Sequence, residues 1–435
     1  MMAQLLAALL CALVLTQGQQ LVSPRASSDY TIKAGFPTSA FSSYYVKPVA
    51  TQEPQPALYD PVLNITFPHN LTDPKTLPTT DNDPVFYPKP VANISNSSMQ
   101  ALLQQTFTNI SGIILGNTVV GNCTKCTASL AVAKVLAQYA PTTVPTLLIE
   151  LCQAFKFSSN ATCVENYAAG SFGAIWTQIL ALADVSGMDG QYICNRLSST
   201  FCPAPKTLPL NVTGLFPKPK PANACAPKAS GKRVKVLHVS DFHLDPRYSV
   251  GSEANCSAGF CCRTNVRAAG VTVNGQVSLA APLYGSFKCD TPYYLALAAV
   301  TAMQRLGSVA WTIYTGDLVS HDSQNQLSRA YTEYTETAVF DLFKEYIGSP
   351  VFAALGNHDS NPEAIDAPHS LPGPLGQQLS WHYDHVSSLW QHNGWINATT
   401  ADQARHHYGA YSVKTNYGLR IITLNTDFWY RSNLL

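Results

Sequence analysis

Three stretches of the sequence decide its fold, and they read VKVLHVSDFHLDP (234–246), WTIYTGDLVSHD (311–322) and VFAALGNHD (351–359). Each opens with a short apolar run rich in β-branched residues, which is typical of a buried strand. Each then continues directly into Asp, His or Asn. Polar residues that follow neighbouring strands gather on the loops at one edge of a sheet, so we expect these side chains in one cleft.

The spacing around these strands predicts an α/β domain over residues 231–435. A fourth strand-like run covers 419–424, and apolar residues recur at helical spacing in 293–306 and 329–347. Buried strands that alternate with helices form a sheet with helices on its faces.

The polar residues after the three strands are those of a two-metal centre. Carboxylate, imidazole and amide ligands suit two divalent cations about 3.5–4 Å apart, as in two-metal phosphoesterases. A carboxylate can bridge both ions, and an amide adds a neutral ligand that keeps the total charge low enough to admit a phosphate. A single Asp or His at a strand end is more commonly a helix cap, but three such motifs in order favour metal binding. The candidates are Asp241, His243, Asp317, His321, Asn357 and His358.

A helical segment with six cysteines precedes this domain, at about 119–206. Apolar residues recur at helical spacing in 130–136, 147–155 and 164–182. Six cysteines permit 15 pairings, so spacing alone leaves the connectivity open. A zinc site or a redox pair at Cys123 and Cys126 is a weaker reading, because no Cys/His quartet completes a zinc site.

Proline-rich stretches flank the helical segment. We expect residues 19–118 to be an extended lead-in rich in Pro, Ser and Thr, and 207–230 to be a semi-stiff linker. Residues 1–18 contain an apolar run too short to span a bilayer but suited to a signal peptide; a buried first helix is the alternative. No later stretch predicts a transmembrane anchor.

The charge balance excludes some partners. The chain has 435 residues, of which 12% are charged, and its net charge is +1. About 25% is usual for a soluble protein. A nucleic-acid-binding protein needs a basic face, for which this balance gives no case.

Glycosylation sequons offer an explanation for the low charge. Ten Asn-x-Ser/Thr sites in a chain with an apparent signal peptide predict a glycosylated protein that is secreted, or delivered to a lysosome-like or vacuole-like lumen. Disulfide formation fits the same oxidising environment. The sites are Asn64, Asn70, Asn93, Asn96, Asn109, Asn122, Asn160, Asn211, Asn255 and Asn397.

The motifs DFHLDP, GDLVSHD and GNHD resemble those of the calcineurin-like metallophosphoesterases, and more closely those of the acid sphingomyelinase (sphingomyelin phosphodiesterase) family. The helical segment resembles a saposin B-type domain, a small lipid-interacting module. The order of saposin domain, proline-rich linker and phosphoesterase is that family's architecture. The resemblance therefore implies a disulfide-bonded helical domain followed by an α/β metallophosphoesterase sandwich.

The resemblance also implies a disulfide pattern. In the saposin-like segment it pairs Cys123 with Cys202, Cys126 with Cys194, and Cys152 with Cys163. In the phosphoesterase domain it pairs Cys256 with Cys261, and Cys262 with Cys289. Cys225 is left without a partner.

The roles carried over from the family are specific. Asp241 and His243 would hold one Zn²⁺, Asp317 would bridge two, and Asn357 would hold the second. His321 and His358 would stabilise the transition state and protonate the leaving alkoxide. The implied reaction hydrolyses sphingomyelin or a related phosphosphingolipid, presented at a membrane or lipid-particle surface by the saposin domain, to ceramide and phosphocholine.

One departure from the family is large. Its remaining zinc ligands come from a GH and a GHxH motif, and neither occurs in this sequence. We therefore expect a C-terminally truncated phosphoesterase domain with little or no activity on its own. Two other functions remain open: a phosphodiesterase or phosphatase acting on nucleotides or other phosphoesters, and a non-catalytic lipid-binding protein.

Overall fold

A computed structural model describes residues 58–67, 83–206, 209–215, 217–222, 224, 231–256, 260–263 and 277–435. The predicted signal peptide at 1–18, the sequon at Asn70 and Cys225 lie outside these residues.

The three strands that precede the candidate ligands are present as predicted. They are β3 (Val236–Val239), β4 (Trp311–Tyr314) and β5 (Val351–Ala353), and they pair in parallel in the order β3-β4-β5. Because the strands are parallel, their carboxyl ends lie at the same edge of the sheet. The motifs that follow them therefore meet there.

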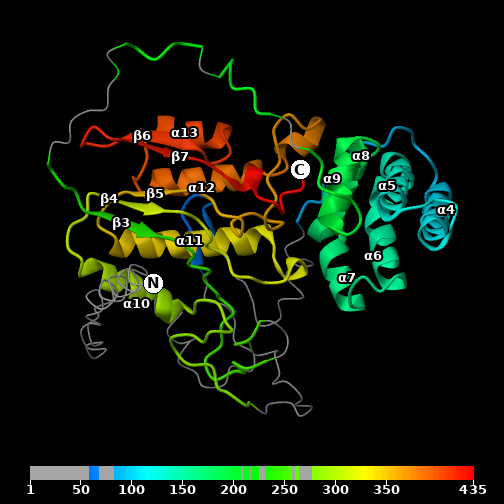
Figure 1. Cartoon of the computed structure of the whole chain (residues 1–435). Coiled ribbons are helices and arrows are strands. Elements are labelled where there is room, and N and C mark those ends of the chain that lie inside the picture. Colours follow the sequence, from blue (N-terminus) through cyan, green and yellow to red (C-terminus); the bar gives the residue numbers. More distant parts are fainter. Residues whose placement is uncertain are drawn as a thin grey trace, which may run out of the picture. The chain divides into compact units, whose positions relative to one another are not determined.

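Helices and a second strand pair complete this part of the chain. Figure 1 shows α10 and α11 below the sheet in that view, with α12, α13 and the antiparallel pair β6–β7 above it. Buried aromatic side chains, among them Tyr314, Phe343 and Trp390, fill the core. The sandwich itself stays a prediction. The elements are α10 (Tyr293–Gln304), α11 (Arg329–Tyr346), α12 (Ser380–His392), α13 (Ala398–His406), β6 (Tyr411–Lys414) and β7 (Arg420–Thr423).

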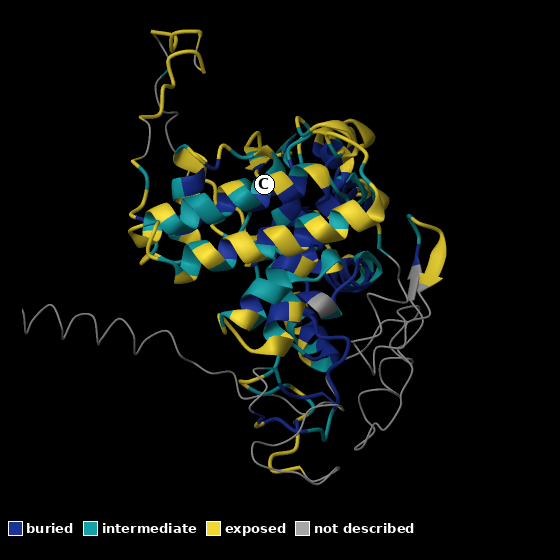
Figure 2. Cartoon of the chain, turned by 90° about the vertical axis from the view of Figure 1, so that its right-hand side faces the viewer, coloured by how far each residue is buried: buried dark blue, intermediate teal, exposed yellow. Residues whose placement is uncertain are grey.

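The helical region contains more helix than the sequence predicts. Figure 2 shows exposed and half-buried residues alternating along its helices. Its elements are α4 (Asn96–Leu115), α5 (Asn122–Tyr139), α6 (Val144–Ala154), α7 (Asn160–Tyr167), α8 (Ala174–Leu182) and α9 (Met188–Leu197).

Two expectations about this region need correction. Residues 96–115, expected within an extended lead-in, form α4, which begins at the cap Ser95 and buries Leu103 and Ile110 against α5 and α6. The helix expected over 164–182 is broken at 168–173. Ser171 has non-helical φ/ψ of −95° and −127° there, and a Cβ at Gly173 would lie 2.3 Å from the Tyr167 carbonyl oxygen, so the chain turns where only glycine fits.

Among the described residues, five disulfides form, and they join the same pairs that the family resemblance implies. Three link α5, α6, α7, α9 and the residues just after α9, which ties the helical region together. The other two staple the loops between β3 and α10. The pairs are Cys123–Cys202, Cys126–Cys194, Cys152–Cys163, Cys256–Cys261 and Cys262–Cys289.

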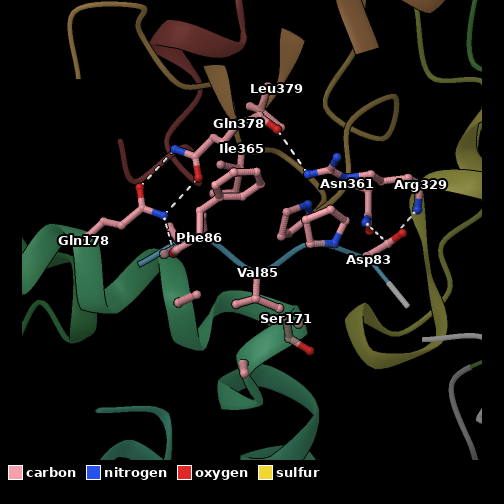
Figure 3. Close-up of a pocket in the computed structure, with 16 residues that line it drawn as sticks. Asp83, Val85, Phe86, Ser171, Gln178, Arg329, Asn361, Ile365, Gln378 and Leu379 are labelled. Atoms are coloured by element: carbon pink, nitrogen blue, oxygen red, sulfur yellow. Dashed lines mark hydrogen bonds between the residues drawn. The ribbon is translucent and has the colours of Figure 1, made fainter. Parts of the chain in front are cut away.

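Residues 83–86 contact both the helical region and the phosphoesterase part (Figure 3). Asp83 Oδ2 accepts hydrogen bonds from the Arg329 backbone N–H (2.8 Å) and from Asn361 Nδ2 (3.1 Å). The carbonyl oxygen of Phe86 accepts one from Gln178 in α8 (3.1 Å). Gln178 and Gln378 also form a reciprocal, buried amide pair at 2.9 and 3.0 Å. These bonds join α8 to the loop region after β5.

A strand hairpin from the lead-in is anchored by a buried acid. Strands β1 (Leu58–Asp60) and β2 (Ile65–Phe67) pair, and the fully buried Asp60 carboxylate lies 2.6 Å from His385 Nε2. His385 Nδ1 lies 2.6 Å from Glu336, which also contacts His382 at 2.8 Å. The lead-in is therefore fixed to α11 and α12 at this point.

This network predicts a pH-dependent stability. Burial alone would lower the pKa of His385, but hydrogen bonds to Asp60 and Glu336 raise it to about 10. The stability that protonated His385 adds to the folded state is complete below its unfolded pKa of about 6.5. This contribution is lost as pH rises through 10. We expect His385→Gln to lower the free energy of unfolding by roughly 3 kcal/mol near pH 6, because two buried carboxylates lose their cation. Denaturant melts should show this deficit narrowing between pH 7 and 10.

The exposed His392, at the end of the same helix, provides the control. His392→Gln should leave the melts unchanged across this range. A deficit for His385→Gln that is the same at pH 7 and pH 10 would contradict the charged assignment.

Candidate metal and active site

The loops after β3 and β4 continue the pairing of the strands. The backbone N–H of Asp241 donates to the Gly316 carbonyl (3.0 Å), that of His243 to Asp317 (3.0 Å), and that of Leu244 to Leu318 (2.8 Å). The polar residues of the two motifs are thus held in register with each other.

Three of the candidate ligands have left-handed backbone conformations. The φ angles of Asp241, His243 and Asp317 are 56°, 37° and 65°. Non-glycine residues rarely adopt this region, and those that do concentrate at functional sites, where the surroundings hold them.

Two glycines permit a close approach of the β4 and β5 loops. Gly316 has φ of +97°, and a Cβ there would lie 2.3 Å from the Gly356 nitrogen. A Cβ on Gly356 would lie 2.2 Å from Asp317 Oδ1. The Gly-Asp and Gly-Asn-His motifs therefore need glycine so that Asp317 can lie against the backbone of the β5 loop.

The Asp359 side chain joins these two loops. Its carboxylate is fully buried and accepts hydrogen bonds from the backbone N–H groups of Leu318 (2.6 Å), Gly356 (2.8 Å) and Asp317 (3.0 Å). Burial and the nearby Asp317 carboxylate raise the pKa of Asp359 to about 7. The sequence motif contains Asp359, but its structural role was not predicted.

Asp241, His243 and Asp317 bring one ligand atom each to within 4.8 Å of one another. His243 Nε2 lies 3.8 Å from Asp241 Oδ1 and 3.6 Å from Asp317 Oδ2. His243 Nδ1 donates a hydrogen bond to the Val319 carbonyl oxygen (2.8 Å), which leaves the Nε2 lone pair facing the carboxylates. Metal-ligating histidines commonly donate their other ring N–H to a carbonyl oxygen in this way, so the three residues fit a divalent cation.

Asn357 lies at the end of β5, where the sequence predicts it, and is half-buried. Its carbonyl oxygen accepts a hydrogen bond from the Ala364 N–H (2.7 Å). The next residue, His358, donates its backbone N–H to Asp317 Oδ1 (3.1 Å). This bond places the Asn357–His358 dipeptide beside the predicted bridging carboxylate.

His321 and His358 lie against His243 and have opposite protonation tendencies. Ring centroids are 4.1 Å apart for His243–His321, 4.8 Å for His243–His358 and 4.2 Å for His321–His358. A hydrogen bond to Asp290, 3.0 Å from His321 Nδ1, raises the pKa of His321. Burial, with His321 and His243 nearby, lowers the pKa of His358 to about 3. One imidazole thus favours holding a proton and the other is neutral.

Two acids at this site were not predicted from the sequence. Asp290 follows Cys289 directly and also accepts the backbone N–H of His321 (2.6 Å). Glu363 Oε1 lies 3.4 Å from His358 Nε2. Asp290's position after a bridged cysteine was a usable signal, whereas nothing around Glu363 in the sequence marks it.

Asp245 and Asp322, which also follow the strands, have a structural role. Asp322 Oδ1 lies 2.7 Å from Arg247 Nη1 and 3.0 Å from Arg263 Nη1, and Asp245 lies 2.9 Å from Arg263. All four side chains are buried. The cluster supports the backbone on either side of the predicted ligands and does not join them.

Residues 234–432 match the calcineurin-like phosphoesterase family. This part of the chain is therefore a calcineurin-like phosphoesterase domain, and that family is metal-dependent, in agreement with the ligand cluster.

The chain is, more specifically, a homologue of sphingomyelin phosphodiesterases. It is 30% identical to sphingomyelin phosphodiesterase B of Dictyostelium discoideum over 66% of this chain and 42% of the relative. It is 27% identical to sphingomyelin phosphodiesterase 2 of Caenorhabditis elegans over 71% of this chain and 51% of the relative. It is 31% identical to a cyclic GMP-AMP phosphodiesterase of Rattus norvegicus over 57% of this chain and 48% of the relative. The chain spans about half the length of these relatives.

Among the residues that the structure describes, none of the helices has both the length and the apolar character needed to cross a bilayer.

The contact between Gly356 and Asp317 yields a prediction. Gly356→Ala places a methyl group 2.2 Å from Asp317 Oδ1 and must displace this ligand. We expect at least a 10-fold loss of affinity for a divalent cation, measured by calorimetric titration with Zn²⁺ as the probe, because the displaced side chains no longer converge on one ion. Gly348→Ala, in the turn before β5 where a Cβ meets nothing within 4 Å, is the control and should bind zinc normally. Equal affinities in the two variants would show that Asp317 does not hold the metal.

Proposed function

We propose that this protein is a zinc-dependent phosphodiesterase that hydrolyses sphingomyelin or a related phosphosphingolipid to ceramide and phosphocholine. The observation that carries the proposal is the convergence of Asp241, His243 and Asp317 at the ends of β3 and β4, with two further histidines against them. The similarity to sphingomyelin phosphodiesterases supports the lipid substrate.

Zinc is the proposed metal because the donors are carboxylate oxygens, an imidazole nitrogen and an amide oxygen. Asp241 and His243 would hold one ion, Asp317 would bridge, and Asn357 would hold the second. When bound, zinc supplies Lewis acidity that lowers the pKa of water and screens the charge of the phosphodiester.

His321 is suited to protonate the leaving group. Its Nδ1 is engaged by Asp290, so the imidazolium presents its Nε2 proton to the site. As water adds to phosphorus and the P–O bond to ceramide breaks, this proton would pass to the alkoxide oxygen. His358, which is neutral, would act as a hydrogen-bond partner for the transition-state oxygens.

The helical region would act as a saposin B-type domain that presents the lipid. Its three disulfides support this assignment, as do apolar side chains left exposed on it. Val120 is 80% exposed, Leu115 74% and Phe157 62%. Exposed apolar surface of this kind suits contact with a lipid surface.

A secretory location, extracellular or in a lysosome-like or vacuole-like lumen, is supported by the sequons. Burial is described for nine of the sequon asparagines, and all nine are exposed. Burial is described for nine other asparagines, and of these only Asn117 and Asn416 are exposed. Exposure at every one of these positions is what oligosaccharide attachment requires.

Nucleotide hydrolysis is a second candidate. The similarity to a cyclic GMP-AMP phosphodiesterase favours it, because the same metal centre can serve different phosphodiesters. A non-catalytic lipid-binding protein would instead bind liposomes without metal-dependent hydrolysis.

Metal dependence is the first test. We expect Asp317→Asn to lower zinc content, measured by mass spectrometry of the purified chain, and to abolish any zinc-dependent release of phosphocholine from labelled sphingomyelin. A carboxylate has two negatively charged oxygens with which to bridge two cations, whereas the amide of asparagine has one neutral oxygen. Because the sequence lacks GH and GHxH motifs, zinc content is the primary readout and turnover the second.

Asp402→Asn is the matched control, since Asp402 is an exposed carboxylate on α13. It should keep wild-type zinc content. Hydrolysis that survives chelation, or faster turnover of cyclic dinucleotides than of sphingomyelin, would contradict the proposed function.

Glycosylation has its own test at the Asn397 site. Asn397 also caps α13 by accepting the Thr400 N–H, so Thr399→Ala removes the sequon without removing the cap. In protein secreted from a eukaryotic host, we expect Thr399→Ala to lose one amide-linked glycan by mass spectrometry. Thr399→Ser keeps the sequon and should keep the glycan; an unmodified Asn397 in both would refute the assignment.

A further inference from the structure

Glu363 places an additional carboxylate beside the histidine cluster. Its Oε1 lies 3.4 Å from His358 Nε2, and its side chain is 24% exposed. The His358 ring is in turn 4.2 Å from the His321 ring, centroid to centroid. Glu363 is therefore a partly open acid next to the residues proposed to handle the phosphodiester.

This carboxylate is held in place. Gln324 Nε2 donates to Glu363 Oε2, and the Glu363 backbone N–H donates to Gln324 Oε1 (3.0 Å). The loop that carries it is fixed by the bond from Asn361 to Asp83 (Figure 3) and by that from Ala364 N–H to the Asn357 carbonyl oxygen (2.7 Å). A group held by its own supporting contacts is preorganised for recognition.

The charge of Glu363 is not balanced by a protein cation with a permanent charge. Within the described part of the chain, no lysine or arginine forms an ion pair with it; its side chain contacts the Gln324 amide and the His358 imidazole. A carboxylate at the rim of a phosphate-binding centre repels a bare phosphate. The Glu363 carboxylate therefore favours a substrate that carries a positive charge of its own. Such a site gains specificity both by attracting the cationic substrate and by repelling the anionic one.

We propose that Glu363 is a specificity-determining residue that accepts a cationic headgroup, quaternary or primary ammonium, linked to the scissile phosphate. In phosphocholine two carbons separate the ester oxygen from the nitrogen, so one headgroup reaches both the phosphate position and a neighbouring carboxylate. The inference rests on the proposed function, which puts the phosphate at Asp241, His243 and Asp317. A residue that only orients His358 would affect all phosphoesters alike.

The test compares two headgroups of the same shape. Phosphocholine and 3,3-dimethylbutyl phosphate differ only in a positive nitrogen against a neutral carbon. We expect the zinc-loaded full chain to bind phosphocholine roughly 2- to 5-fold more tightly by calorimetry, the size of a partly exposed charge pair. In Glu363→Gln, which keeps an acceptor for Gln324, the two affinities should become equal.

Glu150→Gln, a half-buried glutamate on α6, is the matched control and should keep the preference. Equal binding of the two phosphates by the wild type, or a parallel loss of both in Glu363→Gln, overturns the proposal. A metal-free arm compares choline with 3,3-dimethylbutan-1-ol by NMR titration. If neither phosphate binds but a choline preference exists and needs Glu363, the cation site stands and the phosphoesterase proposal fails.

Discussion

The buried carboxylate of Asp359 is the interaction on which the site depends. It accepts three backbone N–H groups, from Asp317, Leu318 and Gly356, that belong to the ends of two neighbouring strands. A buried charge is costly unless it is hydrogen-bonded, and these bonds offset that cost only when the two loops are in register. The left-handed conformation of Asp317 and the contact between Gly316 and Gly356 both follow from that register.

The remaining ligand positions are set by the same logic of satisfied polar groups. Val319 fixes the ring of His243 through Nδ1, and Asp290 fixes that of His321. Asp290 itself lies beside the Cys262–Cys289 bridge, and Thr291 donates its N–H to the His243 carbonyl (3.1 Å). The loop after β3, the bridged segment and the loop after β4 therefore restrain one another, which explains how short strands can hold ligands in strained conformations.

The sequence predicted the elements whose signals are local. Apolar spacing predicts strands β3, β4 and β5 and helices α10 and α11. The Gly-Asp and Gly-Asn-His motifs predict the sharp turns before Asp317 and Asn357. The sequence could not reveal the buried face of α12, because His382 and His385 are polar residues whose shared buried partner, Glu336, lies 46 and 49 positions away. Asp60 meets its partner across 325 residues. Glu363 was missed for the same reason: its meaning depends on what the fold brings beside it.

Hydrogen bonds connect the loop after β5 to the helical region. This loop carries Asn357, His358 and Glu363 toward the site, and Asn361 toward Asp83. One oxygen of Asp83 serves both the Asn361 amide and the Arg329 N–H, so moving residues 83–86 would leave two donors without an acceptor. Each unsatisfied buried donor costs about 1–3 kcal/mol. Because Phe86 and Gln378 both bond to Gln178 in α8, a shift of that helix and a shift of the loop after β5 are opposed by the same contacts. The proposed lipid engagement of the helical region would therefore act on the geometry at His358 through these hydrogen bonds.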